Sequence, residues 1–114
     1  MNRPRSVKAP THLKPATRRW WRAVWESFEL EDHHRKLLDL AATAWDRAES
    51  AREVLDREGV VYVDRFGVPR TRPEVAIERD SRLAFARLLR ELRLDVHPDD
   101  ERLPVLGGGR HYGA

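Results

Sequence analysis

The chain has 114 residues, of which 36% are charged, and its mean hydropathy is −0.71. A chain of this length forms one modest domain, and its lack of cysteine excludes disulfides and thiolate metal sites. No apolar run reaches the roughly 18 residues of a membrane span, so we expect a soluble protein of the cytoplasm that does not associate with membranes.

Charge is distributed unevenly along the chain. The net charge is only +3, but residues 1–22 carry seven basic side chains and no acidic one, and residues 23–64 carry five basic and eleven acidic ones. Blocks of one sign mark interaction surfaces, and a basic block is typical of a site for a polyanion.

The N-terminal part divides into an arm and a first helix. Residues 1–13 contain two prolines and no apolar periodicity, which predicts a flexible basic arm. A helix over about residues 15–28 is predicted, with Pro15 in its first turn. Apolar side chains recur there at i, i+3, i+4 and i+7, and we expect them in the core: Trp21, Val24, Trp25 and Phe28.

A long second helix is predicted over about residues 33–58, with Asp32 as its N-cap and Gly59 as its C-terminal stop. Its apolar seam is heptad-like and consists mostly of small side chains: Leu37, Ala41, Ala44, Ala48, Ala51 and Leu55.

The rest of the chain predicts a helical hairpin and a tail. A β-hairpin over about residues 60–71 leads to a third helix over about 73–93, which Pro73 opens, and residues 95–114 form a flexible tail. The third helix has one broad apolar face: Ile77, Ala84, Phe85, Leu88, Leu89 and Leu92. The fold class is therefore mainly α, with a helical core domain over 14–94 whose two long helices lie antiparallel.

The two long helices carry charged rows of opposite sign on their outward faces. We expect an acidic row of Asp46, Glu49 and Glu53 to meet an arginine row of Arg79, Arg82 and Arg90 on a neighbouring copy. Two alternatives to this contact between copies remain. The arginine row could face DNA, or either row could simply be exposed to solvent.

The basic block supplies the residues that we expect to contact nucleic acid phosphates: Arg3, Arg5, Lys8, Lys14, Arg18, Arg19 and Arg22. A solubilising role is the alternative. Trp20 and Trp21, next to these arginines, have the residue type that stacks on bases, but helical spacing favours the core.

The sequence shows no arrangement for catalysis, metal binding or a cofactor. His33 and His34 are adjacent and so diverge on a helix, and Gly107-Gly108-Gly109 lacks the lysine and hydroxyl residue of a phosphate-binding loop. We therefore do not expect an enzyme.

Several landmarks, in this order, resemble the small terminase subunit family of tailed phages. They are Ala9-Pro10-Thr11-His12-Leu13 before a tryptophan-bearing helix, the long helix up to Glu58-Gly59-Val60, Gly67 and Pro73, and Leu92-Arg93-Leu94 with Pro98 and Arg102-Leu103. The chain departs from the family at Arg72, where a histidine is expected, and at Arg93, where a glycine is common.

The resemblance implies a helical, ring-forming homo-oligomer that binds double-stranded viral DNA in the host cytoplasm. It also implies a partner, the large terminase subunit, which carries the ATPase and nuclease. Two other functions fit the residues: a small DNA-binding transcriptional regulator, and a structural helical assembly protein whose basic arm only keeps it soluble.

Overall fold

The computed structural model describes residues 7–94 and is mainly helical. Three helices and one β-hairpin follow in the order α1 (Pro15–Ser27), α2 (Asp32–Glu58), β1 (Val61–Val63), β2 (Pro69–Thr71) and α3 (Pro73–Glu91). Each predicted element is present, and its ends lie within two residues of the predicted ones.

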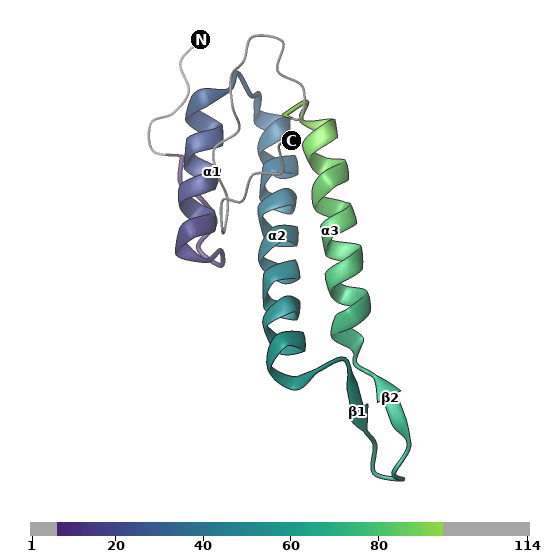
Figure 1. Ribbon diagram of the computed structural model, residues 1–114. Coiled ribbons are helices and arrows are strands. Elements are labelled where there is room, and N and C mark those ends of the chain that lie inside the picture. Colours follow the sequence, from purple (N-terminus) through teal and green to yellow (C-terminus); the bar gives the residue numbers. More distant parts are fainter. Residues whose placement is uncertain (1–6, 95–114) are drawn as a thin grey trace, which may run out of the picture.

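α2 and α3 form a long antiparallel pair, with α1 folded back alongside the N-terminal half of α2 (Figure 1). α2 has 27 residues and is therefore about 40 Å long at 1.5 Å per residue. The β-hairpin projects beyond the end of this pair, away from α1 (Figure 1). None of the helices within residues 7–94 is both long and apolar enough to cross a membrane.

The ends of α2 are set by its capping residues. Its N-cap is Glu31, not Asp32 as predicted, and the Glu31 backbone N–H donates to Nδ1 of His34 at 3.0 Å. Gly59 ends the helix as predicted, because it adopts a φ of 84°, where only glycine avoids a steric penalty. Its N–H donates to the carbonyl of Leu55 at 2.8 Å.

The core lies where α1 meets the two long helices. Trp21, Val24 and Trp25 are buried as predicted, and Phe28 packs half-buried against them. Trp20 and Trp21 are both buried, so they belong to the core and offer no stacking surface for bases. The predicted alanine seam of α2 is buried from Ala41 to Leu55, and Leu37 is half-buried.

The prediction of a flexible arm over residues 1–13 is wrong for residues 7–13. Ala9 and Leu13 are buried in the core cluster, and Val7 packs against it. These apolar side chains are too few to show a helical period, which is why the sequence pattern missed them. Residues 1–6, and the predicted tail over 95–114, lie outside the described residues.

Phe85 connects all three helices from the α3 side. Its ring lies 5.9 Å from that of Trp20 on α1 and 5.2 Å from that of Trp45 on α2, in tilted geometry. The predicted apolar face of α3 is otherwise incompletely covered, since Leu88 and Leu89 are only half-buried and Ile77 is 39% exposed.

The β-hairpin is held at its turn by one carboxylate. Oδ1 of Asp64 accepts hydrogen bonds from the backbone N–H groups of Phe66 and Val68, and Oδ2 accepts one from Nε of Arg70 at 3.0 Å. The bond from Val68, and then that from Arg70, lowers the pKa of Asp64 below 3.8. Gly67 completes the turn at a φ of 79°.

Candidate nucleic-acid interface

α1 presents three arginines on the side that faces away from the core. At 100° per residue, Arg18, Arg19 and Arg22 fall on one stripe, beside the buried face that Trp21 and Val24 occupy. Arg19 and Arg22 are exposed, whereas Arg18 is half-buried and its buried Nε has no hydrogen-bond partner. None of the three forms an ion pair with a residue of the described range, so their charges are available to a ligand.

The orientation of this arginine stripe is fixed by two aspartates of α2. Asp46 accepts hydrogen bonds from the backbone N–H of Lys14 at 2.8 Å and from Oγ1 of Thr17 at 2.5 Å, at the start of α1. A carboxylate in this position satisfies helix-end donors and complements the helix dipole. Further along, Nε1 of Trp21 donates to Asp39 at 2.7 Å. α1 is therefore held along its length with its arginines outward.

The other side chains predicted to contact phosphates differ in exposure and in whether they already form an ion pair. Lys8 is exposed. The ammonium of Lys14 lies 3.7 Å from Oε2 of Glu53, which offsets part of its charge. Arg3 and Arg5 lie outside the described residues.

Of the two charged rows, four members already have partners within the chain. Asp46 and Glu53 contact the start of α1, as described above. On α3, Arg82 pairs with Glu78 at 3.0 Å and Arg79 lies 3.2 Å from Asp80. Glu49 is half-buried and Arg90 is exposed. α1 therefore occupies part of the acidic row and neighbouring acids pair with part of the arginine row, while Glu53, Arg79 and Arg82 remain exposed. The contact of the rows across copies stays a prediction.

An ion cluster that the sequence analysis did not single out joins α2 to α3 near the β-hairpin. Glu78, whose side chain is only 14% exposed, receives Arg52 from α2 at 3.4 Å and Arg82 from its own helix at 3.0 Å. The i, i+4 spacing of Glu78 and Arg82 is a visible signal for half of this cluster. The contact with Arg52 depends on how the helices pack and has no local signal.

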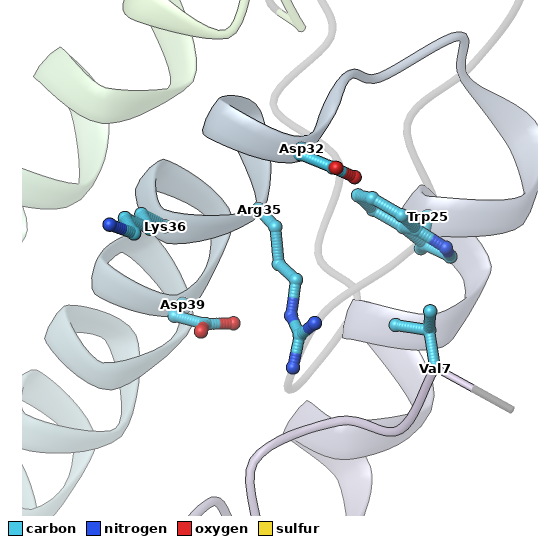
Figure 2. A pocket seen from close by; sticks show the side chains of 6 residues that line it. All are labelled: Val7, Trp25, Asp32, Arg35, Lys36 and Asp39. Atoms are coloured by element: carbon cyan, nitrogen blue, oxygen red, sulfur yellow. The ribbon is translucent and has the colours of Figure 1, made fainter. Parts of the chain in front are cut away.

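A surface hollow of about 500 Å³ opens between the N-terminal segment, α1 and the start of α2. Figure 2 shows its six lining side chains: Val7, Trp25, Asp32, Arg35, Lys36 and Asp39. Its two cations stand beside two carboxylates, so the charges balance and the hollow does not favour an anion. The exposed arginines of α1 remain the stronger candidate for phosphate.

Metal chemistry finds no support in residues 7–94, where no three potential ligand side chains come together. The rings of His33 and His34 lie 4.1 Å apart at the start of α2, so they do not diverge as the sequence predicted. Oε1 of Glu31 lies 3.7 Å from Nδ1 of His33, but these side chains do not form a group that could hold a metal.

The fold and the arginine stripe together define a small helical protein with a basic outward face on its first helix. No family model, curated protein or solved structure matches the chain.

Proposed function

We propose that this chain is a DNA-packaging adaptor, the small terminase subunit of a tailed phage. It binds double-stranded viral DNA through the arginine stripe of α1 and the basic residues before it, and recruits the large subunit with its ATPase and nuclease. It acts as a homo-oligomeric ring in the host cytoplasm, and is not itself an enzyme. The observation that carries DNA binding is the stripe of Arg18, Arg19 and Arg22, exposed or half-exposed and without ion pairs within residues 7–94.

Phosphate binding suits this stripe because it requires several guanidinium groups in a row and no enclosed pocket. The segment that precedes it adds further cations without a single acid. Each phosphate that a basic side chain neutralises releases condensed counterions, so binding weakens steeply as salt increases.

A transcriptional regulator is the alternative function. A helix-turn-helix crosses its two helices at a steep angle, with the second in the major groove. In Figure 1, α1 instead lies alongside α2, and α2 has 27 residues. The arrangement therefore favours the adaptor.

The test replaces Arg18, Arg19 and Arg22 together by glutamine and measures DNA affinity across a salt series. Each lost phosphate contact lowers the slope of log affinity against log salt by about 0.9, so we expect the slope to fall by up to about 2.7. Circular dichroism should remain unchanged, since these side chains lie outside the core.

The matched control changes Arg79, Arg90 and Arg93 of the α3 side to glutamine, which removes the same charge. We expect a much smaller change in slope. If the slope were unaltered in the α1 variant and fell in the α3 variant, the arginines of α3 would be the DNA-binding residues instead.

A further inference from the structure

The side of the α2–α3 pair that α1 does not cover carries a shallow apolar groove. Asp39 and Asp46 of α2 reach α1, whereas Leu40 and Arg47, one position later in each case, turn about 100° away. The groove runs between α2 and α3 and is lined chiefly by Leu40, Ala44, Arg47, Asp80, Ala84 and Leu88.

This groove exposes side chains that a small domain would normally bury. Leu40 is 56% exposed, and Leu88 on α3 is only half-buried. Burying apolar surface stabilises an association, and the entropy of association opposes it. Contiguous exposed apolar surface on a helix pair is typical of a protein–protein contact.

The groove is complementary to itself. Because α2 and α3 are antiparallel and Trp45 contacts Phe85, Leu40 lies about level with Leu88, and Ala44 lies about level with Ala84. Arg47 and Asp80 are level in the same way, on opposite rims.

A two-fold axis parallel to the helices would lay α2 of one copy on α3 of the other. Leucine then meets leucine, and alanine meets alanine at the point of closest approach. Each Arg47 meets the Asp80 of the other copy, and the contact occurs twice.

We propose that two copies of this chain pair face to face through this groove, forming a four-helix bundle. The charges on the rims argue for a second copy as the occupant. Arg47 has no ion pair within residues 7–94, and Asp80, which pairs with the neighbouring Arg79 through Oδ1 at 3.2 Å, is exposed and can accept a second guanidinium at Oδ2. The pairing goes beyond the proposed function and does not depend on DNA, since the arginine stripe lies on α1, away from the groove. A ring would require a second contact in addition to this one.

The first experiment compares two leucines that are almost equally exposed. Leu40 lies in the groove at 56% exposure, and Leu83 lies on the outer side of α3 at 59%. In sedimentation equilibrium, Leu40→Lys should raise the dissociation constant of the pair by about tenfold or more, and Leu83→Lys should leave it nearly unchanged. Equal effects of both changes, or a full-length chain that stays monomeric at high concentration, would overturn the proposal.

Exchanging the charges of Arg47 and Asp80 tests the proposed ion pairs between the rims of the two copies. Arg47→Asp and Asp80→Arg should each weaken pairing, and the double variant should recover most of it, because the reciprocal ion pairs are restored with reversed sign. No recovery would contradict the reciprocal contact. The DNA salt slope should change in none of these variants, so failure of the pairing and failure of DNA binding are distinguishable.

Disulfide crosslinking then tests the symmetry of the pair. Because the chain has no native cysteine, only the introduced cysteines can form a disulfide. A mixture of chains carrying Ala44→Cys and chains carrying Ala84→Cys should form a disulfide between the two kinds of chain and stop at dimers. Little crosslinking in the mixture, or efficient crosslinking within Ala44→Cys alone, would exclude this arrangement.

Discussion

Arg93 shows how a single residue ends α3 under strain. It has a φ of 60°, the left-handed region that glycine prefers. The N–H of Leu94 donates to the carbonyl of Leu89, and that of Arg93 to the carbonyl of Arg90, both at 2.9 Å. This pattern is a Schellman motif, and the buried Leu94 makes its usual apolar contact. Where the resembled family commonly has glycine, this chain therefore accepts a backbone penalty.

We predict that Arg93→Gly stabilises the protein, by about 0.5–1 kcal/mol. The left-handed conformation costs a non-glycine residue about 1–2 kcal/mol, and the greater freedom of glycine in the unfolded chain offsets part of the gain. The measurement is the free energy of unfolding from urea titration.

The control for this prediction is Arg87→Gly, which changes an exposed arginine inside α3. There, glycine should destabilise by about 1 kcal/mol, because the backbone is helical. If Arg93→Gly and Arg87→Gly lowered the free energy of unfolding by similar amounts, the backbone at Arg93 would not be strained.

At the scale of elements, α3 packs along α2 with different contacts at its two ends. Toward its C-terminus, Phe85 and Leu92 pack into the core, whereas near the β-hairpin the contact with α2 includes the Arg52–Glu78 ion pair. The aromatic junction is therefore the point where α3 contacts both α1 and α2.

We predict that Phe85→Ala destabilises the protein by about 3 kcal/mol, because it removes the ring that contacts both Trp20 and Trp45 and leaves a cavity between three helices. Phe66→Ala is the matched control. That ring is 75% exposed at the tip of the β-hairpin, so its loss should change stability by less than about 0.5 kcal/mol.

Urea titration monitored by tryptophan fluorescence measures both changes. If Phe85→Ala were as mild as Phe66→Ala, α3 would not depend on this junction.

Residues 7–94 form a long, thin body for their number (Figure 1). α1 covers only part of one side of the α2–α3 pair (Figure 1). Leucine, isoleucine and valine side chains remain exposed elsewhere. A small domain buries a limited fraction of its surface, and association with further copies is the usual way to cover the rest.

We predict that the full chain forms an assembly of more than four copies, as the proposed packaging function requires. Light scattering after size exclusion measures this mass directly. A stable dimer would agree with the groove pairing and count against the ring, and a monomer at micromolar concentration would contradict both.

The sequence by itself determined the elements, because helical spacing, Pro15, Pro73 and Gly59 act within a few residues of the chain. It also placed the core face of α1 and the alanine seam of α2, since burial follows from apolar periodicity. The basic character of α1 could be read in the same way.

Only the tertiary structure decided which charges remain free and which apolar residues remain exposed. The sequence predicts that Asp46 and Arg82 contact a neighbouring copy, and the structure adds that Asp46 receives the start of α1 and that Arg82 pairs with Glu78. Ala9 and Leu13 were assigned to a flexible arm and are buried. The outcomes at Asp46, Ala9 and Leu13 depend on where α1 and the segment before it rest against α2. That contact brings together residues 32 positions apart in the chain, such as Lys14 and Asp46, and the periodicity of one segment carries no information about it.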